Sequence, residues 1–221
     1  MTAEQLELVP VSTRILTEKD DIVDVIERYA KEKVGADDLV CTAESVVAIT
    51  QGRYVRPEDL RISCMARFLC RFIPDYGSLA TPHGMQSLMD AEGKWRVAFA
   101  LFVGFLGKLI GKKGLFYQLA GEQAALIDDV TGTMPPFDKC IVYGPMEPDN
   151  VAERIKDRLR CFGAIVADVN DLKRSRVVGV SSAVNGELAA QLLLNNPFGN
   201  ASEKRPICII KNYKQYQQMH R

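Results

Sequence analysis

The chain has 221 residues, of which 47% are hydrophobic and 25% charged, so it can bury a full core as one large domain or as two small interlocked ones. Its 28 Lys and Arg residues balance 28 Asp and Glu residues, so no overall field draws it to nucleic acid or to an acidic membrane. We therefore expect a local site, with neither nucleic acid nor a membrane among its partners.

The first half of the chain predicts short helices and strands. Apolar residues at helical spacing from Ile22 to Ala30 predict a helix that ends near Gly35. Residues 39–43 and 46–50 are β-rich runs, which predict two strands. Pro57 stands at a first-turn position and opens a helix whose apolar residues continue to about residue 72.

Residues 97–119, VAFALFVGFLGKLIGKKGLFYQL, are almost continuously apolar, with glycines three or four residues apart. A membrane span is one interpretation, because small residues at that spacing let helices pack closely. However, Lys108, Lys112 and Lys113 interrupt the segment before the roughly 20 apolar residues that a bilayer needs. We favour a helix buried within the protein, with a subunit interface as one option, in which the glycines let another backbone approach.

The second half predicts the order strand, helix, strand. CIVYG at 140–144 is typical of a strand, Pro148 opens an amphipathic helix, and AIVADV at 164–169 predicts the next strand. A helix over 188–194 and a strand over 206–211 follow. In open α/β sheets, ligands bind at the carboxyl ends of the strands.

The six cysteines are scattered, form no CxxC pair and are accompanied by only two histidines. Zinc sites and disulfide frameworks normally have closely spaced cysteines, so we expect free thiols in a reducing cytoplasm. The first residues, MTAEQLELVPVSTRIL, lack the apolar stretch of a signal peptide. These features predict a cytoplasmic location.

Two acidic pairs lie where an apolar segment meets a loop. Asp128 and Asp129 follow AALI, and Asp168 and Asp171 follow AIVA. Carboxylates from two such loops suit Mg²⁺ or Mn²⁺, which takes one or two of them and leaves its other positions to water and phosphate. Aspartates are also common turn residues and helix caps, and the spacing alone leaves both interpretations open.

Four stretches resemble, in the same order, motifs of the coenzyme F420-0:L-glutamate ligase (F420-0:gamma-glutamyl ligase) family. They are GADDLVCTAESVVAITQGR at 35–53, AGEQAALIDD at 120–129, MEPDNVAERIKDRL at 146–159 and GAIVADVND at 163–171. The resemblance covers most of the chain from about residue 20 to 211. Its most specific parts are ESVVAITQGR and EPDNVAERI, neither of which is a common local pattern.

The resemblance implies an α+β fold in which helices pack on mixed sheets. It favours a single ligase-like domain over 1–221, with an optional helical insertion at about 76–121, where the chain looks unlike the family. The implied enzyme is a homodimer that uses GTP and Mn²⁺ or Mg²⁺. It would add L-glutamate to a deazaflavin coenzyme precursor, or to another carboxylate, through an acyl phosphate. A monovalent cation is a further expectation.

Particular residues inherit roles from the family's motifs. Asp128 or Asp129 matches one metal-binding aspartate, and Asp168 matches the one that follows a later strand. Glu44 matches the acid before the family's lysine, and Arg53 matches its Gly-Arg. The resemblance therefore implies catalytic roles for Glu44 and Arg53 and metal binding for the three aspartates.

The stretch VADVNDLKRSR at 166–176 can be a turn or a site. In a turn, its aspartates would cap local amides. In a site, Asp168 would hold the metal while Lys173, Arg174 or Arg176 faces its phosphates. We favour the site, because a carboxylate at a strand end beside several cations suits a metal-phosphate clamp and because the matching family position binds metal.

The chain also departs from the family at two positions. Ser45 replaces the lysine after Glu44, and LKRSR replaces the family's Gly-Arg-Pro-Trp-Arg stretch after the later aspartate. Lysine and arginine differ in how they bind phosphate. Two functional classes therefore stay open: an amide ligase, and a non-catalytic or repurposed relative that binds a nucleotide or another phosphorylated ligand.

Overall fold

The structure, a computed structural model, describes residues 6–74, 78–127, 135–170, 173–199 and 203–220. The chain divides into two compact units. Unit 1 consists of Met1–Gly52 and Pro145–Arg221, and unit 2 of Arg53–Gly144. The second unit is thus inserted in the first, and its boundaries lie outside the expected insertion at 76–121.

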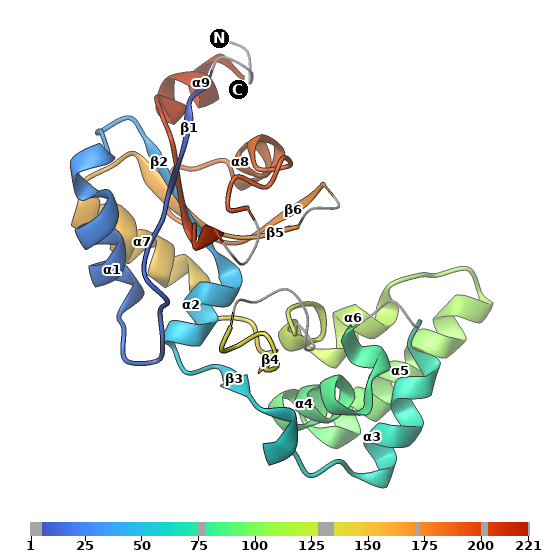
Figure 1. The fold of residues 1–221 in the computed structure, drawn as a ribbon. Helices are drawn as coiled ribbons and strands as arrows, with labels where there is room; N and C mark the ends of the chain where they lie inside the picture. Colours follow the sequence, from blue (N-terminus) through green and yellow to red (C-terminus); the bar gives the residue numbers. More distant parts are fainter. Residues whose placement is uncertain (1–5, 75–77, 128–134, 171–172, 200–202, 221) are drawn as a thin grey trace. The chain divides into compact units, whose positions relative to one another are not determined.

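Within the described residues, unit 1 holds five strands in one mixed sheet (Figure 1). The strands are β1 (Leu8–Val11), β2 (Leu39–Ala43), β5 (Gly163–Asn170), β6 (Arg174–Val180) and β7 (Ile207–Ile210). Their spatial order is β1-β7-β2-β5-β6. The central neighbours β2 and β5 are parallel, whereas the pairs β1 with β7, β2 with β7 and β5 with β6 are antiparallel.

Helices cover both faces of this sheet, and the apolar side chains of β5 explain why. Ala164 and Val166 face a core shared with α1 (Ile22–Ala30), α2 (Glu44–Thr50) and α7 (Pro148–Leu159). Ile165 and Ala167 face the other core, shared with α8 (Gly186–Leu192) and α9 (Tyr213–Met219). A central strand buried on both faces is apolar at successive positions, as β5 is up to Ala167.

Polar contacts attach α7 to the edge strand β6. The Asp149 carboxylate accepts a hydrogen bond from the Val180 amide at 2.7 Å, and Glu153 accepts one from the Ser182 amide at 2.7 Å. A Cβ on Gly179 would lie 2.5 Å from the carbonyl oxygen of Pro148, so only glycine allows the start of α7 to approach this strand.

Unit 2 is mainly helical. Its helices are α3 (Cys64–Leu69), α4 (Pro82–Glu92), α5 (Lys94–Leu109) and α6 (Leu115–Ala120), and the short strands β3 (Tyr54–Val55) and β4 (Ile141–Val142) pair antiparallel. Short 3₁₀ turns lie at Pro57–Asp59, Cys70–Phe72, Ser78–Ala80 and Glu122–Ala125, with one more in unit 1 at Lys31–Lys33. Side chains from α3, α4, α5 and α6 share one core with Ile141.

The prediction of a single helix over 97–119 that is buried within the chain is wrong, and the option of a subunit interface stays a prediction. The segment forms α5 and α6, joined by a turn in which Gly111 and Gly114 have positive φ. Phe102 remains 62% exposed and Leu109 69% exposed. The expected close backbone approach does occur, but within the chain: a Cβ on Gly104 would lie 3.2 Å from the backbone of Phe116. No helix in the described ranges is both long and apolar enough to cross a bilayer.

The α+β class is confirmed, but three of the predicted elements differ. Residues 46–50 lie in α2, because the pairing of β2 with β5 ends at Ala43 and Ala167 and the helix buries Val47 against the core. The strand predicted at 140–144 is only β4, which pairs with β3 and lies in a different sheet from β5. The helix predicted from Pro57 to about residue 72 begins with a 3₁₀ turn, and α3 starts only at Cys64.

All six cysteines are free thiols, as expected, and only Cys64 is exposed. Burial raises the pKa of the Cys161 thiol to about 11 and that of Cys208 to about 12. A buried thiol with a raised pKa stays protonated at neutral pH and is a poor nucleophile. These cysteines therefore contribute to packing.

Candidate functional site

Two acidic residues lie where the pairing of the two parallel strands at the centre of the unit 1 sheet ends: Glu44 follows β2, and Asp168 is in the last part of β5. Ala43 of β2 lies beside Ala167 of β5 in the register, so Glu44 and Asp168 come next along neighbouring strands that run in the same direction. Glu44 opens α2 and is 9% exposed. Parallel strands end at the same edge of a sheet, which is where α/β proteins bind ligands.

Asp168 lies in a partly desolvated position beside a cation. The residue as a whole is exposed, yet burial by nearby protein raises the pKa of its carboxyl, and the charge of Arg176 offsets part of that increase. Arg176 is the cross-strand partner of Asp168 on β6. Both effects are expected of a carboxylate that meets its charge partner at the edge of a core.

Thr42 adds a buried hydroxyl close to these carboxylates. It is fully buried on β2, opposite Val166 of β5, and its Oγ1 finds no hydrogen-bond partner among the described residues. Side chains alternate along a strand, so Thr42 lies on the same face of the sheet as Asp168, with the two Cα atoms roughly 8 Å apart. Since buried hydroxyls are normally hydrogen-bonded, this one is suited to a bound group.

The cations predicted to bind phosphate come from the β5–β6 hairpin. The register pairs Asn170 with Arg174 and Asp168 with Arg176, so both arginines project from the same face of β6 as Asp168 does from β5. Lys173 precedes β6 with a φ of 57°, a turn conformation. The described residues of this stretch, 166–170 and 173–176, therefore lie in or next to two paired strands and bring a carboxylate and two guanidinium groups to one face. Its role as a site stays a prediction.

A second source of positive charge was missed in the sequence. The backbone amide of Ala43 donates to the carbonyl of Pro206 at 2.9 Å, so the residues before β7 lie beside the end of β2. Two of them are basic, Lys204 and Arg205. No local pattern marks them, because β7 reaches β2 from more than 160 residues along the chain.

The other predicted site residues lie elsewhere in the chain. Arg53 belongs to unit 2, where its Nε donates to the Gly144 carbonyl at 2.6 Å and its guanidinium lies 5.6 Å from the centre of the Tyr143 ring. Asp128 and Asp129 lie outside the described residues, as does Asp171. Sharing of one cation between Asp168 and the 128–129 pair therefore stays a prediction. No three His, Cys, Asp or Glu side chains gather in the described part of the chain.

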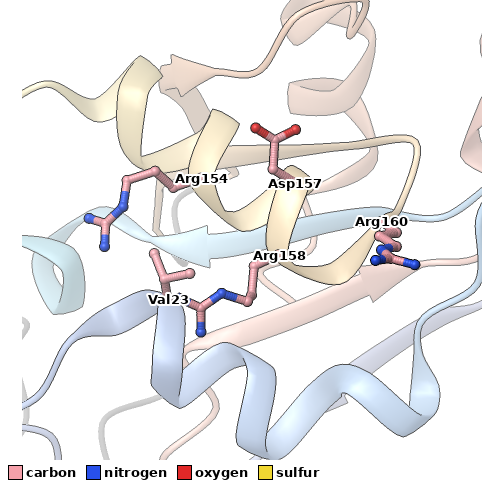
Figure 2. Close-up of a pocket in the computed structure, with 5 residues that line it drawn as sticks. All are labelled: Val23, Arg154, Asp157, Arg158 and Arg160. Carbon is pink, nitrogen blue, oxygen red and sulfur yellow. The ribbon is translucent and has the colours of Figure 1, made fainter.

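An arginine-lined hollow of about 450 Å³ lies between α1 and α7 (Figure 2). Its lining residues are Val23, Arg154, Asp157, Arg158 and Arg160. Arg154 pairs with Asp21 at 3.0 Å, and Arg158 pairs with Asp24 at 2.9 Å and Glu27 at 2.7 Å. Two of its three arginines thus already have carboxylate partners within unit 1.

Comparison with known proteins supports the relationship predicted from the motifs. The family model of F420-0:Gamma-glutamyl ligase matches residues 10–96. The matched range includes β2, Glu44 and Arg53 and ends before Asp168 and the hairpin cations. No curated protein sequence matches the chain. The match confirms the resemblance predicted from the motifs over residues 10–96, and the rest of the chain lies outside the matched range.

Proposed function

We propose that this relative of the F420-0:gamma-glutamyl ligases is a GTP-dependent amide ligase that uses Mg²⁺ or Mn²⁺. It would join L-glutamate to a carboxylate acceptor, with a deazaflavin coenzyme precursor as the acceptor that the resemblance implies. The observation that carries the proposal is the position of Glu44 and Asp168 at the end of the parallel pairing of β2 with β5, with Arg174 and Arg176 on the neighbouring strand β6.

The residues at this edge suit a metal-bound phosphate. Magnesium sites commonly use one or two carboxylates and complete their coordination with water and substrate phosphate, and Asp168 is the carboxylate proposed as the ligand at this edge. The buried hydroxyl of Thr42, with no partner among the described residues, is a further oxygen on the same face. When bound, the metal would neutralise phosphate charge and polarise the phosphoryl group.

The cations would act on the nucleotide. Arg174 and Arg176 carry planar guanidinium groups that bind phosphate through two hydrogen bonds, and Lys173 supplies a point charge at the hairpin turn. Phosphoryl transfer depends chiefly on positioning and on neutralising charge as it shifts between oxygens. We therefore assign the hairpin to the triphosphate and the strand ends to the metal.

Amide formation then needs two steps that balance. An acceptor carboxylate oxygen attacks the γ-phosphorus, which forms an acyl phosphate and releases GDP. The amino group of glutamate next attacks the acyl carbon, phosphate leaves, and the nitrogen loses a proton. Glu44 is the proposed acceptor of that proton, since a poorly exposed carboxylate can act as a general base. Arg53 is the proposed second catalytic residue and would contact the acceptor substrate. The enzyme is proposed to be active as a homodimer.

Ser45 is the reason to retain the second functional class, a repurposed relative that binds a nucleotide without forming an amide. It follows Glu44 in the first turn of α2, where the family has a lysine, so one phosphate-binding charge is lost. A repurposed relative would bind GTP with metal but would release no phosphate when glutamate and a carboxylate acceptor are added. A coupled assay for phosphate release distinguishes the two classes.

Isothermal titration of the full chain with GTP and Mn²⁺ tests the site itself. We expect metal-dependent binding that weakens at least tenfold in Asp168→Asn and in Arg174→Ala, a loss of about 1.4 kcal/mol or more. Asp157→Asn and Arg28→Ala are the matched controls, because both residues are exposed on helices of unit 1, away from the hairpin. Absence of any nucleotide binding in the presence of metal would refute the proposal.

A further inference from the structure

Helix α5 carries a row of large apolar side chains that unit 2 leaves exposed. We name this row the α5 face, and it consists of Trp95, Phe99, Phe102, Leu106 and Leu109. The residues follow one another at intervals of four and three, so they share one side of the helix. Their exposed fractions run from 44% for Leu106 to 73% for Trp95.

The opposite side of α5 is also apolar, and it is the side that packs. Val97, Ala100 and Gly107 are buried there, and Val97 and Ala100 belong to the core of unit 2. A helix that is apolar all round normally has partners on every side. The three aromatic residues of the α5 face alone expose on the order of 400 Å², as much as the largest apolar patch of a typical monomer. The face is therefore suited to an occupant.

The charge around the α5 face has one sign. Between Glu92 and Glu122 the sequence holds five basic residues and no acidic one. The basic residues are Lys94, Arg96, Lys108, Lys112 and Lys113. Arg96 is held within the unit, where it pairs with Glu92 at 2.8 Å and donates to the Leu119 carbonyl at 3.0 Å. The four lysines are exposed and lie at the two ends of the face.

This charge pattern disfavours a second copy of the chain as the occupant. Two α5 faces packed together, parallel or antiparallel, would bring lysine-bearing ends against each other with no carboxylate of 94–120 to compensate. The surface of an anionic bilayer suits both the exposed apolar side chains of the α5 face and the lysines at its two ends. Its acyl boundary accepts aromatic and leucine side chains, and its phosphates accept the lysines. Tryptophan is also favoured at this depth.

We propose that the α5 face docks on the surface of an anionic phospholipid bilayer through its local lysines, although the balanced charge of the whole chain predicts no membrane partner. The 16 residues of α5 span about 24 Å, less than the roughly 30 Å of a hydrocarbon core, so the helix lies along the interface and does not cross it. The lysines at both ends reach the headgroups while the rings enter the acyl boundary. A homodimer of the ligase would then use a different surface.

The single tryptophan of the chain reports on this contact directly. Trp95 is the only tryptophan in the sequence and belongs to the α5 face. We would titrate the full chain with vesicles of phosphatidylglycerol and phosphatidylcholine and record its emission. The expected result is a blue shift, with quenching by lipids brominated on their acyl chains. Pure phosphatidylcholine vesicles and high salt should both weaken the binding, because each removes attraction for the lysines.

Variants separate the apolar and the charged contributions to vesicle binding. Phe99→Ser combined with Phe102→Ser should weaken vesicle binding by at least about tenfold, with Met219→Ser as the control at an exposed apolar residue of α9. Lys112→Glu combined with Lys113→Glu should weaken binding to anionic vesicles at low salt. Lys19→Glu, an exposed cation of unit 1, should not. Far-ultraviolet circular dichroism verifies that each variant is folded.

Three results would overturn the inference. The first is no emission shift and no quenching with anionic vesicles. The second is equal affinity for neutral and anionic vesicles. The third is a blue shift without lipid that follows protein concentration and a monomer–dimer equilibrium in sedimentation, and that the paired Phe99 and Phe102 substitutions abolish. That third result would assign the α5 face to a second copy of the chain.

Discussion

Strand β5 and helix α5 are both apolar runs, yet the chain covers them differently. Ile165 and Val166 of β5 face the two opposite cores of unit 1, and both are fully buried. In α5, only one side reaches a core, and Phe102 on the other side is largely exposed. An apolar sequence therefore shows how much surface needs cover, and the tertiary structure decides whether the same chain provides it.

The largest expected effect on stability comes from replacing one large apolar side chain of β5, and one of α5, with alanine. Ile165→Ala should lower the free energy of unfolding by about 2–5 kcal/mol, because it leaves a cavity in a closed core. Phe102→Ala should change it by less than about 1 kcal/mol, since its ring is mostly exposed and alanine favours the helix. Urea denaturation measures both. Equal losses in the two variants would show that the α5 face is covered within the chain.

A smaller effect is expected where α5 meets α6. Gly104→Ala would place a Cβ 2.9 Å from that of Phe116 and 3.2 Å from its backbone, so α6 must move. Overpacking of this kind costs about 1–3 kcal/mol, which thermal unfolding can measure. Leu106→Ala, on the exposed side of the same helix, is the control. A Gly104→Ala variant as stable as the parent chain would mean that α6 is not packed as described.

The smallest effect concerns Asp168 and pH. Burial raises the pKa of its carboxyl, so the folded state binds this proton more tightly than the unfolded state. Ionisation therefore costs stability as the pH rises from about 4 through the raised pKa. Asp168→Asn should remove that loss and leave the free energy of unfolding at pH 7 unchanged or slightly higher. A marked destabilisation by Asp168→Asn, absent in Asp157→Asn, would mean that Asp168 stabilises the fold and is not held ready for a ligand.

The sequence predicted those parts of the fold in which local pattern and tertiary structure agree. The strands at 39–43 and near 164–169 are apolar and end at polar residues, and both exist. The β-branched run at 46–50 became a helix, because the pairing of β2 with β5 ends at Ala43 and Ala167 and Val47 packs against the core from α2, while β5 itself continues to Asn170. Strand β6 was missed because it is an edge strand whose first residues include exposed charged ones, Arg174 and Arg176.

The candidate site was predictable only where it follows a strand. Asp168 could be selected from the end of an apolar run. Its neighbour Glu44 could be selected only through the resemblance to the family, because no local sequence pattern indicates that β2 and β5 are parallel partners. Thr42 gave no signal, since a threonine near a strand end is ordinary, and Lys204 and Arg205 come near β2 only through the pairing of β7.

The most direct test of the proposed site is a titration of the full chain with Mn²⁺ in the presence of GTP, followed by electron paramagnetic resonance. The signal of free Mn²⁺ falls when the ion becomes bound, so the spectrum counts ions held by protein and nucleotide together. We predict binding beyond that of GTP alone, reduced at least about tenfold in Asp168→Asn and unchanged in Asp157→Asn. Equal binding by the parent chain and Asp168→Asn would contradict a metal site at the carboxyl ends of β2 and β5.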